Sequence, residues 1–108
     1  MAGRVLAIEC SNAIVAIMQV ARDAAVVACH FRMLDERLLD RVQPDLVLAP
    51  LMSCTFDASD LARRLAQLRF RGALVIAAPH LPRPELVEAE LRRLCRGFTM
   101  TLMSPARI

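Results

Sequence analysis

Cys10 is the residue whose sequence setting most resembles that of a reactive group. It follows a short apolar segment, and Ser11 or Asn12 after it is a suitable N-cap for a helix. The dipole of that helix would stabilise a thiolate, as a phosphatase or phosphotransfer loop built on cysteine requires. Such a loop also surrounds its anion with glycine backbone or an arginine, and the segment from Cys10 to Ala16 contains neither. We therefore favour an unreactive, buried thiol.

The remaining soft side chains do not have the spacing of a metal site. Cys29 and His30 are adjacent, but Cys54 and His80 are isolated, and the chain has no pair of cysteines separated by two residues. We predict no metal and no cofactor. Four scattered cysteines, together with an N-terminus unlike a signal peptide, are typical of a reduced, cytoplasmic protein.

The composition limits the classes of protein that the chain can represent. With 108 residues, 56% hydrophobic residues and a net charge of +3, the chain is expected to form one aliphatic domain, 1–108, rather than a disordered segment. It contains no lysine, which excludes Schiff-base chemistry. The apolar segment from Ala13 to Ala21 contains Gln19 and is shorter than the ~20 residues of a membrane-spanning helix, so no membrane association is expected.

Short apolar segments alternate with amphipathic ones along the whole chain. The short segments predict strands at 4–9, 24–29, 46–50, 73–78 and 98–103, and the amphipathic ones predict four intervening helices. This βαβαβαβαβ order predicts an α/β, flavodoxin-like fold, with a five-stranded parallel sheet of order 2-1-3-4-5 and helices on both faces. Ligands of such folds bind at the carboxyl ends of the strands. Those ends carry Glu9, Cys10, Pro50, Leu51, Ala78 and Ser104.

The segment from Pro44 to Leu65 resembles the receiver domain of bacterial response regulators. That family reads PDLVLLDLMMP, then a loop and an amphipathic helix, where this chain reads PDLVLAPLMSC and a similar pattern of leucine and arginine. The order of elements extends the similarity over nearly the whole chain. The resemblance implies a receiver-like fold and a role in bacterial signal transduction.

The resemblance fails at the residues that perform the family's phosphorylation chemistry. Pro50 stands in place of the aspartate that accepts phosphate, and Glu9-Cys10 stands in place of the acidic pair that holds Mg²⁺. Ala78 replaces a threonine or serine, and Ser104 replaces a lysine. We therefore predict a degenerate pseudo-receiver that is not phosphorylated, is not an enzyme, and acts on an unidentified signalling protein through protein contacts.

The first predicted helix is apolar over an arc of about 200°, roughly twice what one contact requires. A receiver normally ends in a fifth helix beside it, and the sequence continues only to Ile108, so we expect that helix to be absent. An apolar surface of this size is expected to be buried in a homodimer. The predicted interface contains Ala13, Ala16, Ile17 and Val20.

Three other interpretations stay open. The chain is alternatively a small enzyme or ligand-binding protein that uses the crevice near Glu9, Cys10 and Ser53. Arginines of the third and fourth predicted helices would form a basic surface if those helices are neighbours, although we favour solvated helix faces over nucleic-acid binding. The proline-rich loop from His80 to Pro84 is a third candidate, as a docking surface for a protein.

Overall fold

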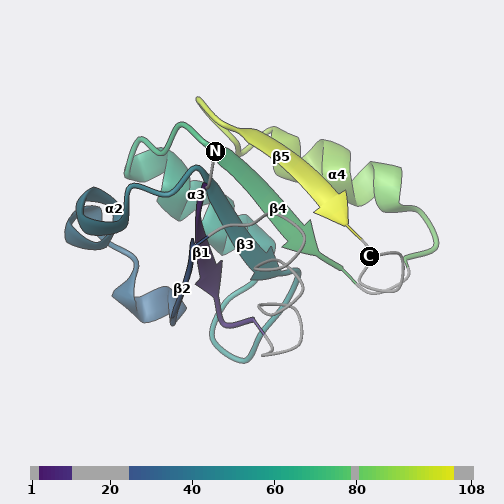
Figure 1. Cartoon of the computed structure of the whole chain (residues 1–108). Helices are drawn as coiled ribbons and strands as arrows, with labels where there is room; N and C mark the ends of the chain where they lie inside the picture. The colour runs from purple at the N-terminus through teal and green to yellow at the C-terminus, as the bar shows by residue number, and fades with distance from the viewer. Residues whose placement is uncertain (1–2, 11–24, 79–80, 104–108) are drawn as a thin grey trace.

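The fold is one parallel sheet flanked by helices (Figure 1). The computed structural model describes residues 3–10, 25–78 and 81–103. The strands are β1 (Arg4–Ile8), β2 (Ala25–Cys29), β3 (Leu46–Pro50), β4 (Ala73–Ala77) and β5 (Thr99–Met103). The helices are the 3-10 turn η1 (Phe31–Met33), α2 (Glu36–Val42), α3 (Ala58–Gln67) and α4 (Pro84–Arg92). The strand order is β2-β1-β3-β4-β5, which confirms the predicted sheet.

The register of the strands brings their carboxyl ends to one edge of the sheet. Ile8 at the end of β1 pairs with Cys29, and Pro50 at the end of β3 pairs with Ala77. Ala77 pairs in turn with Met103 at the end of β5. Loops that follow these ends therefore meet at one place, which we call the carboxyl edge.

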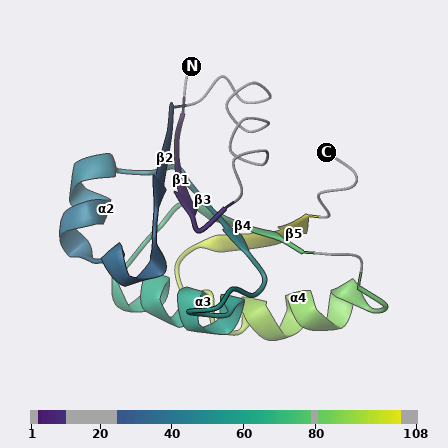
Figure 2. The same cartoon turned by 90° about the horizontal axis from the view of Figure 1, so that it is seen from below.

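The main core lies between the sheet and the helices α3 and α4, with α2 beside the edge formed by β2 (Figure 2). Alternate residues of each strand face this core because successive side chains point to opposite faces. Its largest fully buried side chains include Leu6, Ile8, Leu61, Leu65, Leu74 and Ile76. Burying each of these contributes about 1.5–3 kcal/mol, so this layer supplies most of the stability.

The opposite face of the sheet has a smaller core. Val5, Leu46 and Leu48 are buried there, whereas Val75 is only half-buried. Thr99 and Thr101 of β5 are exposed. The helix predicted for this face, with the interface residues Ala13, Ala16, Ile17 and Val20, lies outside the described residues. So does the segment where a fifth helix was expected to be absent.

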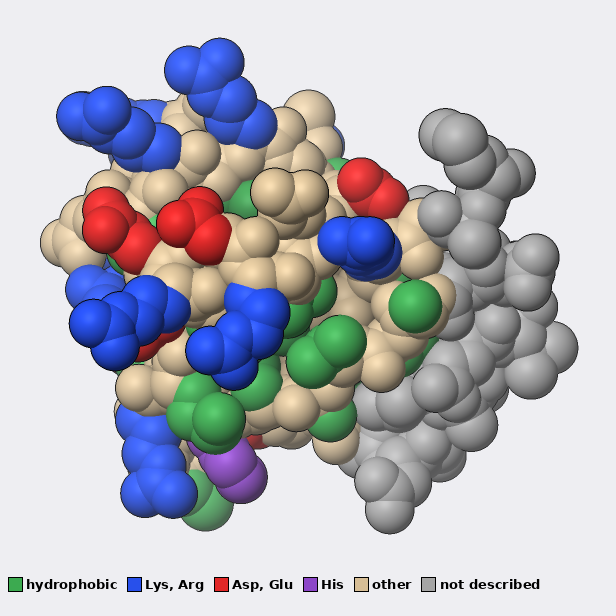
Figure 3. All heavy atoms as spheres, turned by 60° about the vertical axis from the view of Figure 1, so that its left-hand side comes forward, with side chains coloured by type: hydrophobic (Ala, Val, Ile, Leu, Met, Phe, Trp, Pro, Cys, Tyr) green, Lys and Arg blue, Asp and Glu red, His purple; other side chains and the backbone are tan. Residues whose placement is uncertain are grey.

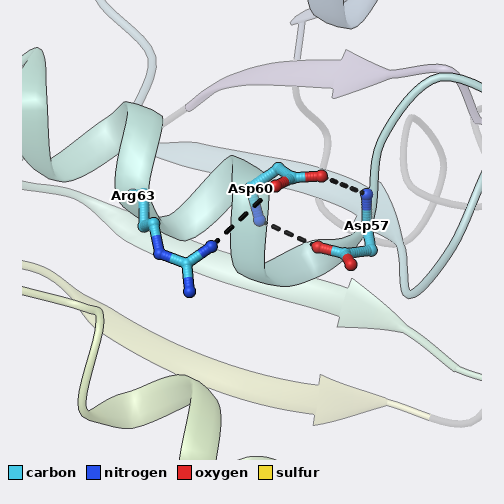
Figure 4. Close-up of polar contacts among 3 residues, drawn as sticks. All are labelled: Asp57, Asp60 and Arg63. Atoms are coloured by element: carbon cyan, nitrogen blue, oxygen red, sulfur yellow. Dashed lines mark hydrogen bonds and ion pairs between the residues drawn. The ribbon is translucent and has the colours of Figure 1, made fainter.

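The sequence predicts Asp57 as the N-cap of the third helix, with Asp60 in its first turn, and α3 begins directly after Asp57 (Figure 4). The Asp57 carboxylate accepts from the amide of Asp60 at 2.9 Å, and the Asp60 carboxylate accepts from the amide of Asp57 at 3.1 Å. This reciprocal capping box satisfies two amides that have no partner within the helix. Arg63 lies 3.9 Å from the Asp60 carboxylate and adds a weak, exposed ion pair.

Two helix predictions need correction. The spacing of Leu34, Leu38 and Val42 predicts a helix over 34–42. In the structure Asp35 caps α2 by accepting from the Leu38 amide, and Leu34 is buried just before it. The spacing of Leu86, Val87, Leu91 and Leu94 predicts one apolar side of the fourth helix. Leu86 is nevertheless 55% exposed, because α4 turns Val87 and Leu91 toward the sheet. Within the described segments, no helix is long and apolar enough to cross a membrane.

Candidate functional site at the carboxyl edge

Most of the predicted site residues lie where the sequence places them, at the carboxyl edge. Glu9 and Cys10 follow β1, Pro50 is the last residue of β3, and Ala78 follows β4. The backbone continues the ladder past the strands, since the amide of Leu51 donates to the Ala77 carbonyl at 3.1 Å. The amide of Ala78 donates to the Met103 carbonyl at 2.9 Å. Ser104 lies outside the described residues.

Glu9 connects three segments of the chain. Its carboxylate oxygen Oε2 accepts from the Thr55 hydroxyl at 2.7 Å and from the Phe31 amide at 3.0 Å. Its own amide donates to the Cys29 carbonyl at 2.9 Å. The backbone of Glu9 has a φ of 52°, in the left-handed region that costs a non-glycine residue energy. We call Glu9, Thr55 and Phe31 the Glu9 clamp.

The Glu9 clamp favours the ionised form of its carboxyl group. The hydrogen bond from Thr55, followed by that from the Phe31 amide, lowers the pKa of Glu9 below its ordinary value of 4.5. The side chain is therefore a carboxylate at neutral pH. Both of its hydrogen-bond donors come from the protein itself.

The loop between β3 and α3 is organised around the Glu9 clamp by a second set of contacts. The Ser53 hydroxyl oxygen accepts from the amides of Thr55 and Phe56 at 3.2 and 3.3 Å. The ring of Phe56 stacks on that of Phe31, with centroids 4.8 Å apart and planes inclined by 17°. Polar and aromatic contacts thus join this loop to the segment that follows β2.

Cys10 has the environment of an unreactive thiol. Its Sγ lies 3.4 Å from the Leu48 carbonyl oxygen and 3.6 Å from that of Ile8, so the thiol donates to backbone oxygens. Burial raises the pKa of Cys10 to about 11, which leaves it protonated at neutral pH. Burial also raises the pKa of Cys29 to about 11. Neither thiol is activated as a nucleophile.

Of the candidate metal ligands, Cys29, His30 and Cys54 lie in the described residues and His80 lies outside them. Across residues 3–10, 25–78 and 81–103, no three side chains of histidine, cysteine, aspartate or glutamate gather in a manner that suits a metal ion. At the carboxyl edge itself, Glu9 supplies a carboxylate, but Cys10 and Pro50 supply no oxygen from their side chains. This donor set is a poor match for Mg²⁺, which prefers several oxygen ligands.

The arginines of α3 and α4 divide into two groups. The two helices are neighbours, as the basic surface would require. Arg63 and Arg92 pair with acidic residues of their own helices, and Arg64 donates twice to the Leu34 carbonyl at 3.2 Å. These three side chains are thereby occupied. Past the helix ends, three others line a shallow hollow of about 390 Å³: Arg69, Arg71 and Arg96.

Sequence reasoning missed the two donors of the Glu9 clamp. Thr55 is 46 residues from Glu9 in the chain, and Phe31 contributes a backbone amide that no side-chain pattern reveals. The nearest signal was the cluster of Ser53, Thr55 and Asp57, because short polar side chains before a helix commonly bond to local backbone.

Comparison with solved structures identifies the architecture. The receiver domain of RstA from Klebsiella pneumoniae, in its BeF3-activated form, superposes with a TM-score of 0.67 at 19% identity, over 96% of this chain and 90% of that one. The signal receiver domain of a putative Luxo repressor protein from Vibrio parahaemolyticus gives 0.66 at 17% identity, over 99% and 84%. The chain has the receiver fold.

The two comparisons based on sequence found no match. No family model matches the chain, and no curated protein matches it either. The predicted fold class is thus confirmed by shape, while the chemistry of the site depends on the residues of this chain.

Proposed function

We propose that this chain is a pseudo-receiver, a regulatory module of bacterial signalling that acts through protein contacts and takes up no phosphate. The observation that carries the proposal is Pro50 at the end of β3. By the resemblance of the segment from Pro44 to Leu65, this is the position of the phosphate-accepting aspartate. Proline has no nucleophilic side chain and no backbone N–H. At the neighbouring strand ends, Cys10 lacks the carboxylate and Ala78 lacks the hydroxyl that the resemblance implies for a receiver.

The Glu9 clamp supports a single, fixed state of the loops. The resemblance implies that an ordinary receiver holds phosphate and Mg²⁺ at its carboxyl edge. Here the Glu9 carboxylate already accepts from Thr55, in the loop after β3, and from Phe31, at the start of η1. A contact supplied by the chain itself takes the place of one supplied by a ligand. We infer that the surface of this module is constant and that its partner reads it without a switch.

We propose that the chain carries out no catalysis of its own. The rival interpretation, a small enzyme using the crevice near Glu9 and Cys10, needs an activated group there. The raised pKa of Cys10 and the lowered pKa of Glu9 instead leave a protonated thiol and an engaged carboxylate. A protonated thiol is a poor nucleophile, and an ionised carboxylate has no proton to donate as a general acid.

We also propose that the module is a homodimer, formed by the first predicted helix and the part of the sheet face that carries Val75, Thr99 and Thr101. The half-buried Val75 and the exposed Thr99 and Thr101 on that face are consistent with a surface that accepts further cover. Ala16→Arg places a charged side chain in the predicted interface and is expected to convert the dimer into a monomer, as measured by sedimentation velocity. Ala89→Arg, on the exposed side of α4, is the control and is expected to remain a dimer. An unmodified chain that sediments as a monomer at every concentration contradicts the dimer.

Amide hydrogen exchange tests the proposed function. The chain is measured with and without acetyl phosphate and Mg²⁺, and protection is compared over residues 51–57 and at Phe31. We expect identical protection, because the loops have no phosphoryl group to respond to. A change in protection that requires both reagents would show that the loops switch, and the fixed-state proposal would be rejected. A receiver with the complete acidic site serves as the positive control.

A further inference from the structure

A groove lies between the edge strand β2 and the helix α2. It has a volume of about 530 Å³, in the range of sites that hold ligands. Figure 3 shows hydrophobic side chains gathered on this side of the molecule, between several basic ones. The residues that line the groove are Arg4, Ala25, Val27, Ala28, Cys29, Met33, Leu38, Arg41 and Val42. Seven of these nine side chains are apolar, and both charged ones are arginines.

The strand β2 lacks the features that normally protect an edge. Its sequence, AVVAC, contains no charge and no proline, which are the usual safeguards against pairing with another strand. Val27 is 41% exposed and Met33 is 50% exposed. By contrast, β5 at the other edge turns two threonines outward. An exposed apolar edge of this kind is a candidate surface for strand addition.

The backbone of β2 is oriented for such pairing. The Ala25 amide donates to the Gly3 carbonyl at 3.0 Å, and the Cys29 carbonyl accepts from the Glu9 amide at 2.9 Å. Alternate residues of a strand turn their backbone groups to the same neighbour, so Ala25 and Cys29 face β1. The intervening Val26 and Ala28 therefore direct their N–H and C=O groups to the open edge, where an added strand can bond to them.

The charge at one end of the groove selects among possible occupants. Arg4 begins β1 and Arg41 lies in the last turn of α2. The Arg4 guanidinium donates to the Val42 carbonyl at 3.2 Å, which holds it at the groove. The nearby Asp45 carboxylate accepts from the Arg4 amide rather than from its side chain. Among the described residues, neither arginine makes an ion pair.

We propose that this groove binds an extended peptide segment of a partner protein that places apolar side chains over Val27 and Met33 and an acidic side chain against Arg4 and Arg41. A second copy of this chain fits less well, because its own β2 carries no acidic residue to meet the arginines. The inference deepens the proposed function, on which it rests, by naming the surface and the kind of partner.

Fluorescence anisotropy with labelled synthetic peptides tests the proposal. The probe alternates valine with threonine and ends in a pair of glutamates, and its matched control ends in a pair of lysines. We expect the acidic peptide to bind at least about tenfold more tightly than the basic one. Arg41→Glu is expected to lower the affinity for the acidic peptide by about tenfold or more and to raise the affinity for the basic peptide. Arg93→Glu, at the end of α4, changes the same charge elsewhere and is expected to leave both affinities unchanged.

A second variant separates the apolar contact from the charge. Val27→Asp is expected to abolish binding of the acidic peptide, and amide resonances of Val26 and Ala28 are expected to shift when that peptide is added to the unmodified chain. Equal affinity for the two peptides, or an equal loss in Arg93→Glu, overturns the proposal. A dimer of the unmodified chain that Val27→Asp dissociates identifies a second copy as the occupant and also overturns it. If neither peptide binds, and amide hydrogen exchange is unchanged by acetyl phosphate and Mg²⁺, the proposal for this groove is rejected. The proposed function then stands, because its own test is passed.

Discussion

Introducing the four side chains that the receiver resemblance implies is expected to make the chain accept a phosphoryl group. The variant combines Cys10→Asp, Pro50→Asp, Ala78→Thr and Ser104→Lys, and it keeps Glu9. With acetyl phosphate as donor, the new carboxylate at position 50 attacks phosphorus, an acyl phosphate bond forms and acetate leaves. The carboxylates at positions 9 and 10 then offer Mg²⁺ the oxygen ligands that the unmodified chain lacks. We expect an increase in intact mass of one phosphoryl group that requires Mg²⁺.

The matched control for this variant carries Pro50→Asn with the other three substitutions unchanged. Asparagine restores the backbone N–H and has nearly the same shape as aspartate but offers no carboxylate. We expect no adduct on the control. Two results would show that the strand ends do not have the geometry we assign to them. One is an adduct that forms equally on the variant and on its control, and the other is a folded variant with all four substitutions that gains no mass.

Thr55→Val is expected to lower the free energy of unfolding by about 0.5 kcal/mol at neutral pH, since solvent weakens this exposed hydrogen bond. The substitution removes the hydroxyl that donates to Glu9 at 2.7 Å while keeping the shape of the side chain. The pKa of Glu9 is below 4.5 in the folded chain, so the clamp stabilises the fold above that pH. This contribution disappears as pH falls through the folded-state pKa. The difference between the unmodified chain and the variant should therefore shrink in acid.

Urea denaturation over a series of pH values measures this difference. Thr55→Ser keeps the hydroxyl and is expected to retain most of the stability, which separates the hydrogen bond from the loss of a methyl group. A Thr55→Val variant that loses the same free energy in acid as at neutral pH would show that the hydrogen bond to the Glu9 carboxylate is not the cause. Equal losses in Thr55→Val and Thr55→Ser would point to packing instead.

The features of the fold that were predictable from sequence are those with a local physical cause. Strands such as Leu46–Pro50 are short apolar segments bounded by breaking residues, and Asp57 with Asp60 is a capping box that can be read directly. Alternation of such segments restricts the chain to a parallel sheet with right-handed crossovers. Five strands favour the order 2-1-3-4-5, and the structure confirms it.

The site was less predictable because its contacts are distant in the chain. The sequence places Glu9 and Cys10 at a strand end, but nothing in it indicates that Glu9 adopts a left-handed backbone and meets Thr55. The exposure of Leu86 was missed for a related reason. Periodicity predicts which side of a helix is apolar. It does not predict how α4 is rotated about its axis against the sheet, and that rotation decides which apolar residues are buried and which are exposed.

Intact mass spectrometry of the unmodified chain, after incubation with acetyl phosphate and Mg²⁺, tests the central claim most directly. We predict that the mass stays unchanged, because Pro50 provides no acceptor and the Glu9 carboxylate is engaged by Thr55 and Phe31. An increase of one phosphoryl group that depends on Mg²⁺ and maps to the carboxyl edge would contradict the account.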